Sequence, residues 1–209
     1  MRSCRANEDE SSAFPWPWLC QVVDEVLPSG IPLAEIKQES QMTRYQLAKI
    51  VSWAGDLQAR KRLQKVVYLL QSAGCPLRAE FSLHHYGPYS EELARLTDEM
   101  VRQSLLEEQS SEHSQGKQYS YRLSAAAARE ITDLEATKPG QVWAGELAGF
   151  EAMAKQLLAE DLKQLEYAST IVYFRNQDND WEAAVAKAET FKLTPAVKNA
   201  LSLAKKVIS

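Results

Sequence analysis

Residues 62–71 read Arg-Leu-Gln-Lys-Val-Val-Tyr-Leu-Leu-Gln and form the clearest helical pattern in the chain. Their apolar members recur at the spacing i, i+3, i+4 and i+7, the signature of one buried helix face: Leu63, Val66, Val67 and Leu70. Gly74 lies where a helix takes a left-handed terminator, and Pro76 prevents the helix from continuing. The pattern therefore predicts a helix from about residue 57 to residue 73, with its apolar face in the core.

The segments around this helix predict further elements. Thr43 is a suitable cap for a helix over residues 44–55. Apolar and polar residues alternate over 78–86, which is typical of a strand. Ser90 can cap a helix over 90–103, whose first turn carries two glutamates that favour the helix dipole.

Between that strand and that helix lies a turn motif, residues 86–90, with the sequence Tyr86, Gly87, Pro88, Tyr89 and Ser90. Gly87 allows a dihedral that other residues avoid, and Pro88 fixes the next one. We expect Gly87 and Pro88 to end the strand. These properties explain the turn without a ligand, so we interpret it as structural.

A hairpin and another helix complete the pattern. Tyrosines and a leucine alternate with polar residues over 119–123, which predicts a strand after the polar stretch 107–117. Ser124 can cap a helix over 125–136. The order helix, helix, strand, helix, hairpin is that of a winged helix-turn-helix domain, in which the tip of the wing would lie at about residues 108–116.

The predicted fold is thus mostly α, in the α+β class, with a winged-helix-like core over residues 42–137. Lys138-Pro139-Gly140 is expected to close this core. Residues 138–209 predict a C-terminal helical extension, with helices near 147–174, at 181–191 and at 196–208. Because the connections are short, we expect the extension to pack on the core.

Residues 1–41 differ in composition from the rest. They hold three basic and seven acidic residues, which accounts for the whole net charge of −4 in a chain of 209 residues. The apolar stretch 14–20 is interrupted by two prolines and follows acidic residues, so it matches a secretory signal poorly. The segment predicts either a partly disordered extension or a short docked helix built on residues 19–27.

Composition narrows the classes of function. No apolar run approaches the roughly 18 residues that a membrane helix needs, so no membrane association is expected. Three cysteines without metal-ligand spacing favour a reducing, cytoplasmic location. A pI near 5.5 argues against holding nucleic acid by bulk charge.

No catalytic or metal-binding motif is found in the sequence, so we expect no enzyme activity, no cofactor and no metal. His84 and His85 are the only tempting pair. Neighbouring strand residues point to opposite faces, so the two imidazoles cannot readily share one metal. We expect one packed and one exposed histidine.

The only basic cluster is Arg60, Lys61, Arg62 and Lys65. It is interpreted as a solvated helix face, with phosphate contact as the alternative. The helix over 90–103 would be the recognition helix of a winged-helix DNA reader. It carries four acidic and two basic residues, and carboxylates facing phosphates repel. The fold therefore resembles a DNA-binding shape with the wrong charge for that use.

Two of these motifs carry a resemblance to a known family. The helix motif 62–71, followed by the turn 86–90 and Leu93, resembles the YwgA-like group of bacterial proteins and, more distantly, the Panacea (SocA-like antitoxin) domain. The similarity covers about residues 58–136, with a weaker echo at 165–171. The lysine usual at the start of the family's helical motif is here Arg62. The resemblance to Panacea implies a protein-binding role in an antitoxin or phage-defence setting.

We therefore expect a non-catalytic protein-binding module, an antitoxin-like or defence-associated regulator, whose partner is another protein such as a toxin. The sequence leaves the oligomeric state open. The alternative is a winged-helix DNA-binding transcriptional regulator. The side chains expected to contact the partner lie on the exposed face of the 90–103 helix and at the wing tip: Glu91, Arg95, Asp98, Arg102 and His113.

Overall fold

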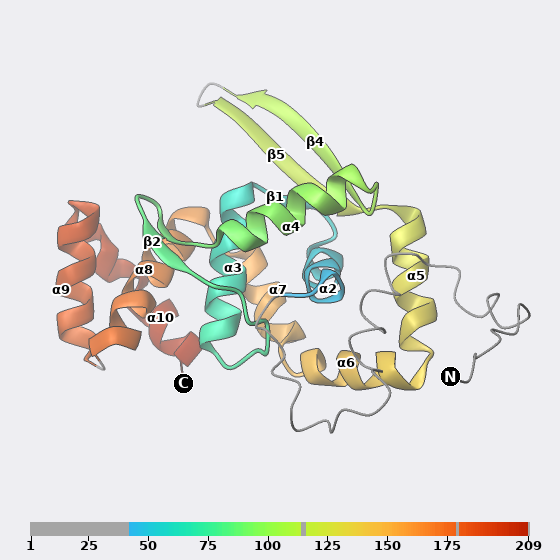
Figure 1. The fold of residues 1–209 in the computed structure, drawn as a ribbon. Helices are drawn as coiled ribbons and strands as arrows, with labels where there is room; N and C mark the ends of the chain where they lie inside the picture. The colour runs from blue at the N-terminus through green and yellow to red at the C-terminus, as the bar shows by residue number, and fades with distance from the viewer. Residues whose placement is uncertain (1–41, 114–115, 179, 209) are drawn as a thin grey trace, which may run out of the picture. The chain divides into compact units, whose positions relative to one another are not determined.

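A computed structural model describes residues 42–113, 116–178 and 180–208. The prediction for residues 1–41, an extension or docked helix, falls outside these ranges. The described chain is mostly helical with a small antiparallel sheet, which confirms the α+β class (Figure 1). Within the described residues, no helix is both long and apolar enough to cross a membrane.

The described chain up to residue 135 contains both sheets and four helices. These elements are α2 (Arg44–Ala54), β1 (Leu57–Gln58), α3 (Arg60–Ser72), β2 (Ser82–His84), β3 (Gly87–Tyr89), α4 (Glu91–Arg102), β4 (Leu106–His113), β5 (Gly116–Leu123) and α5 (Ala125–Glu135). The strand order is β1-β5-β4, and β2 pairs separately with β3. In Figure 1, β4 and β5 extend away from the helices as a long hairpin.

The predicted helix caps are confirmed. The Thr43 hydroxyl oxygen accepts a hydrogen bond from the Gln46 N–H, and the Thr43 N–H donates to the Gln46 side-chain oxygen, which completes a capping box. Ser90 and Ser124 accept from the N–H groups three residues later, at the starts of α4 and α5. The apolar face of α3 is fully buried, as its spacing predicted.

Two predicted boundaries near α3 are wrong. The helix begins at Arg60, because Leu57 and Gln58 form a strand that pairs with Tyr121 and Ser120. The strand predicted over 78–86 is shorter and is the first half of a hairpin.

In that hairpin the chain turns at His85 and Tyr86. Gly87 and Pro88, which we expected to end a strand, instead begin β3 and pair with His84 and Leu83.

The predicted tip of the wing is too long. Residues 108–113 and Gly116, predicted to lie in this tip, belong to β4 and β5, which are paired from Leu106 to His113. Lys138-Pro139-Gly140, which we expected to close the core, forms the first turn of α6 (Lys138–Ala148). The Thr137 hydroxyl caps that helix, and proline is accepted in its first turn because the N–H there has no helical partner.

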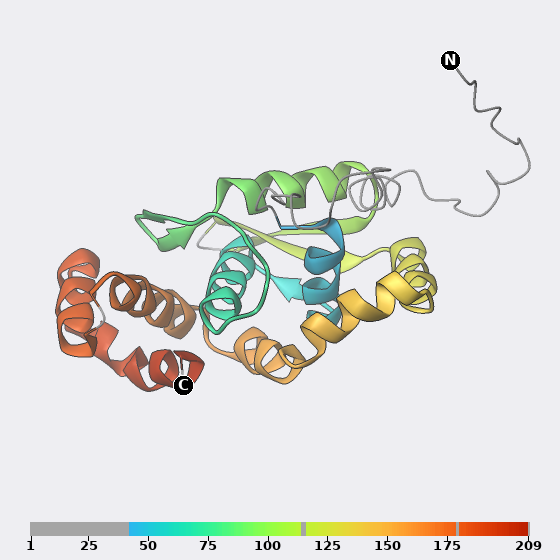
Figure 2. The ribbon, with the colours of Figure 1, turned by 60° about the horizontal axis from the view of Figure 1, so that its bottom comes forward.

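The last helices of the chain pack around α8 (Leu162–Asp178), and three of the C-terminal helices contact α3. The other C-terminal helices are α7 (Glu151–Ala159), α9 (Trp181–Lys192), the 3-10 helix η1 (Pro195–Ala200) and α10 (Leu201–Ile208). Helix α3 contacts α7, α8 and α10, and α8 also contacts β3. Figure 2 shows α3 between α2 on one side and the α8–α10 group on the other. The last predicted helix, over 196–208, is therefore divided into η1 and α10.

Gly140 allows the close approach of α5 and α6. A Cβ atom at this position would lie 2.0 Å from the Leu134 carbonyl oxygen, which belongs to the backbone and cannot turn away. Gly145, in the same helix, has nothing within 4 Å of the corresponding position.

We expect Gly140→Ala to lower the free energy of unfolding in urea by about 2 kcal/mol or more, because the two helices must separate. Gly145→Ala is the matched control and should raise it by about 0.5–1 kcal/mol through helix propensity. Equal effects of the two substitutions would contradict this account.

Candidate functional site

The α3 helix holds the backbone of the β2–β3 segment at both ends through two glutamine side chains. The Gln71 amide donates to the Ala79 carbonyl (2.9 Å) and accepts from the Ala79 N–H (2.7 Å). Likewise, the Gln64 amide donates to the Ser90 carbonyl (3.0 Å) and accepts from the Ser90 N–H (2.8 Å). The two glutamines are seven residues apart, so they lie on one face of α3.

Lys65 makes a third bond from α3 to this segment. Its ammonium donates to the Pro88 carbonyl at 2.6 Å, and the side chain is 2% exposed. Burial lowers the pKa of Lys65 to about 8, assisted by the charges of Lys192 and Lys61 and opposed by Glu166. The expectation that the basic cluster is a solvated face is thus wrong for Lys65.

The other side of the hairpin lies against α8. Gly87 has φ +90°, and a Cβ atom there would lie 2.6 Å from the Thr170 hydroxyl oxygen and 3.7 Å from the Lys65 ammonium. The Thr170 hydroxyl donates to the Glu166 carbonyl at 2.7 Å, which fixes it in this position. Only glycine accommodates both the dihedral and the contact.

A salt bridge from α9 closes this region. The Lys192 ammonium lies 2.6 Å from the Glu166 carboxylate, and both side chains are largely buried. It also donates to the His85 carbonyl at 3.1 Å. Burial lowers the pKa of Lys192 despite the bond to Glu166. The hairpin is therefore held by α3, α8 and α9 together.

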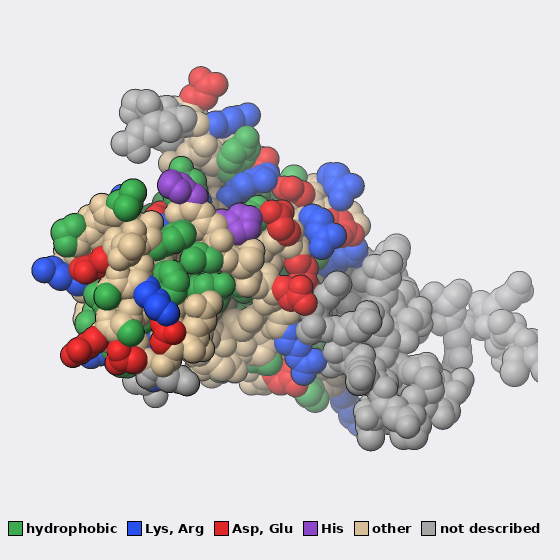
Figure 3. Space-filling model, turned by 60° about the vertical axis from the view of Figure 1, so that its left-hand side comes forward, with side chains coloured by type: hydrophobic (Ala, Val, Ile, Leu, Met, Phe, Trp, Pro, Cys, Tyr) green, Lys and Arg blue, Asp and Glu red, His purple; other side chains and the backbone are tan. Residues whose placement is uncertain are grey.

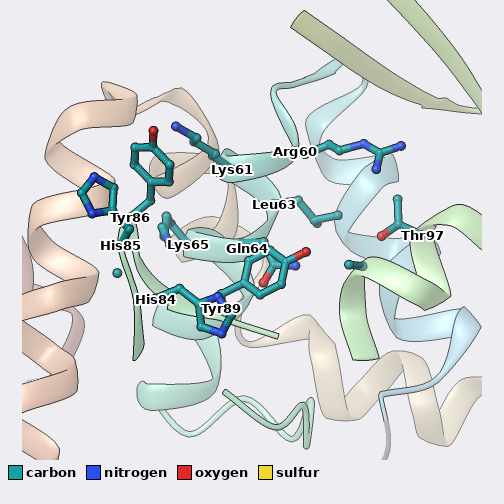
Figure 4. A pocket seen from close by; sticks show the side chains of 12 residues that line it. Arg60, Lys61, Leu63, Gln64, Lys65, His84, His85, Tyr86, Tyr89 and Thr97 are labelled. Carbon is teal, nitrogen blue, oxygen red and sulfur yellow. The ribbon is translucent and has the colours of Figure 1, made fainter. Parts of the chain in front are cut away.

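A pocket of about 300 Å³ opens between the hairpin, α3 and α4 (Figure 4). Its walls are formed by Arg60, Lys61, Leu63, Gln64, Lys65, His84, His85, Tyr86, Gly87, Tyr89, Ala94 and Thr97. The Lys61 ammonium lies 3.2 Å from the centre of the Tyr86 ring, and the His84 and Tyr89 ring centres are 5.0 Å apart. The residue types at this site were visible in the sequence, but the pocket was not predicted.

The two histidines are both exposed, so the expectation of one packed and one exposed histidine is wrong. Figure 3 shows the histidine side chains of the described residues at the surface, with basic side chains beside them. Across the described ranges, no group of three histidine, cysteine or acidic residues is placed to hold a metal.

The two arginines of the cluster have partners inside the fold. Arg60 pairs with Asp98 at 2.9 Å and Glu108 at 2.8 Å, and its Nε donates to the Tyr121 hydroxyl. Arg62 donates to the backbone carbonyls at the end of α7, those of Leu158 (2.9 Å) and Glu160.

The partner-binding residues expected on α4 are exposed: Glu91, Arg95, Asp98 and Arg102. Asp98, however, is paired with Arg60, and Glu99 of the same helix is paired with Arg44. His113 is the last residue of β4, opposite Gly116, and its side chain lies outside the described part.

Comparison with known proteins gives a limited result. No protein-family model matches the chain. The chain is 27% identical over 134 residues to the uncharacterized protein YwgA of Bacillus subtilis. The aligned residues make up 64% of this chain and 75% of that protein. This similarity supports a YwgA-like family, while the relation to the Panacea domain stays a prediction.

We expect Gly87→Ala to lower the free energy of unfolding by about 2–4 kcal/mol, since it adds a clash with Thr170 to the cost of a positive φ. Gly74→Ala separates the two effects, because Gly74 has φ +94° with nothing within 4 Å of its Cβ position. It should cost only about 1 kcal/mol in the same urea titration. A Gly87→Ala variant as stable as Gly74→Ala would show that the hairpin does not pack on α8 as described.

The buried Lys65 ammonium makes stability depend on pH. An unfolded lysine keeps its ordinary pKa of 10.5, whereas the folded pKa is about 8. Between these values the unfolded chain binds the additional proton, so the free energy of unfolding rises with pH; below pH 8 the full cost of burying the charge is present. Between about pH 8 and pH 9.5, the free energy of unfolding of the wild-type protein should rise by on the order of 2 kcal/mol relative to that of Lys65→Met.

The measurement is a urea titration of both proteins at each pH, with Lys205→Met as a control at an exposed lysine. Lys205→Met should follow the wild-type profile. Parallel profiles for wild type and Lys65→Met would contradict a buried, charged Lys65.

Proposed function

We propose that this protein is a non-catalytic protein-binding module built on a winged-helix core. The order α2-β1-α3-α4-β4-β5 and the sheet order β1-β5-β4 support the winged-helix assignment, in which β4 and β5 form the wing and α4 takes the place of the recognition helix. The β2–β3 hairpin is then an insertion between the second and third helices.

One observation carries the choice of a protein partner over DNA: three of the four residues of the basic cluster, all except Lys61, are already bound within the fold. Arg60 is paired with two carboxylates, Arg62 with backbone carbonyls, and Lys65 with the Pro88 carbonyl. Duplex DNA is held chiefly by lysine and arginine side chains that contact phosphates. These side chains would have to break their present bonds before they could contact DNA phosphates.

The surface offered to a partner is the outer face of α4 together with the β4–β5 hairpin. Glu91, Arg95 and Arg102 are exposed and make no ion pair within the described residues. On β4, the exposed carboxylate Glu112 lies on the same strand face as Glu108, which binds Arg60 next to α4. Exposed charges contribute little to stability but govern association rate and partner choice, so the surface favours a partner whose charges complement Glu91, Arg95 and Arg102.

The resemblance to the Panacea domain extends the proposal to an antitoxin-like or phage-defence-associated regulator in the cytoplasm. Its partner would be a toxin or another defence component. The similarity to YwgA gives no activity to transfer, because that protein is uncharacterized.

The second candidate is a winged-helix DNA-binding regulator, which the element order favours by itself. It requires that Arg60, Lys61, Arg62 and Lys65 contact phosphates. Duplex DNA binding that weakens steeply as salt rises, and that is lost in Lys61→Gln, would support this candidate over ours.

A charge reversal on α4 tests the proposed surface. Glu91 and Glu182 are exposed glutamates in the first turns of α4 and α9, so reversal of either has the same unfavourable effect on a helix dipole. We expect Glu91→Lys combined with Glu112→Lys to weaken binding of the partner by about tenfold, whereas Glu182→Lys does not. Asp98 and Glu99 are left intact because they pair within the fold.

The measurement compares affinity capture by the wild-type and variant proteins, followed by titration of the captured partner and by melting curves of each variant. All variants should melt within a few degrees of wild type. Equal affinity of the double variant and Glu182→Lys for the partner would exclude this surface.

A further inference from the structure

The pocket between the hairpin, α3 and α4 has a strongly one-sided charge. Its twelve lining residues include two lysines, two histidines and Arg60, which is paired with Asp98 and Glu108, and none is an aspartate or glutamate. The chain as a whole has a net charge of −4, so this concentration of basic groups is opposite to the composition of the protein. A concave basic wall is the arrangement that attracts an anion.

Two of the cations lack a counterion. Lys61 and Lys65 lie one helical turn apart on α3, and neither forms an ion pair within the ranges that the structure describes. Lys65 uses one of its three donors, on the Pro88 carbonyl, although it is buried. The nearby Glu166 carboxylate is bonded to Lys192. A buried ammonium without a carboxylate is costly, and a bound anion would remove that cost.

The rest of the wall suits a flat ring. Tyr86 is 49% exposed although its ring lies beside the pocket, and His84 and Tyr89 form a second pair of rings. Leu63 and Ala94 add apolar surface. In Figure 4 the side chains of Lys61 and Tyr86 lie side by side at one end of the pocket, and Thr97 lies at the other end. A volume of about 300 Å³ is at the lower limit for ligand pockets, which favours a single small molecule.

We propose that this pocket binds a small organic phosphate, namely a phosphate monoester of a molecule with a flat ring. The phosphate lies between Lys61 and Lys65, and the ring lies against Tyr86 and Tyr89. A phosphate monoester carries close to two negative charges at neutral pH, which matches the two lysines without counterions. The assignment does not depend on the proposed protein partner, since the pocket and the outer face of α4 are different surfaces.

Isothermal titration of the full chain with phenyl phosphate and with adenosine 5′-monophosphate tests the site. Inorganic phosphate, phenol and adenosine each supply only one half of the ligand, so each should bind at least about tenfold more weakly than the monoester that contains it. Lys61→Gln removes one charge-assisted contact and should weaken monoester binding about tenfold. Lys205→Gln is the matched control, because Lys205 is also an exposed helical lysine near an aromatic ring, that of Trp181; it should bind as wild type.

Lys65→Met should abolish binding, but its burial puts folding at risk. Ala94→Phe is therefore a second variant, which fills the pocket from α4 and should prevent binding while the melting curve stays cooperative. No binding of either monoester at 10 mM by the wild-type protein would overturn the proposal. So would equal affinities for wild type, Lys61→Gln and Ala94→Phe, or an affinity for inorganic phosphate as high as for the monoesters.

Discussion

The structure depends on how the backbone of residues 79–90 is satisfied. A hairpin of two three-residue strands is not stable by itself, and its buried N–H and C=O groups need partners. Helix α3 supplies them through Gln71, Gln64 and Lys65, whose bonds end on the backbone rather than on side chains. Because the clamp on Ser90 also fixes the residue that caps α4, it sets where α4 begins and therefore where its outer face lies.

The packing of the β2–β3 hairpin on α3 and α8 also explains why three separate sequence motifs occur in one chain. The stretches 62–71, 86–90 and 165–171 meet around Gly87, where a Cβ atom would contact the Lys65 ammonium and the Glu166 carbonyl and would clash with the Thr170 hydroxyl. A glycine at position 87, a lysine at 65 and a small hydroxyl residue at 170 are consequences of one packing arrangement. The motif that carries the resemblance to YwgA is in this sense structural, and it forms one wall of the pocket.

Sequence reasoning succeeded where the determinants are local. The apolar face of α3 and the caps at Thr43, Ser90 and Ser124 depend on spacing and on side chains within a turn. It failed where a distant segment decides. Leu57 and Gln58 are extended because β5 lies beside them, some sixty residues later in the chain. A two-residue strand has no period to detect, and the proline of β3 normally argues against a strand.

At the candidate site, the sequence alone also failed to predict which charged side chains are buried or paired. In the sequence, a basic residue on the polar side of an amphipathic helix indicates solvent, yet Lys65 is buried by α8 and the hairpin. Likewise, the net charge of −2 on the 90–103 helix overstates its acidity, because Asp98 and Glu99 are neutralised by Arg60 and Arg44. Pairing within the fold removes charge from the outer face of α4 and leaves Lys61 and Lys65 uncompensated. The two uncompensated lysines thus lie at the pocket, which a count of charged residues along the chain does not reveal.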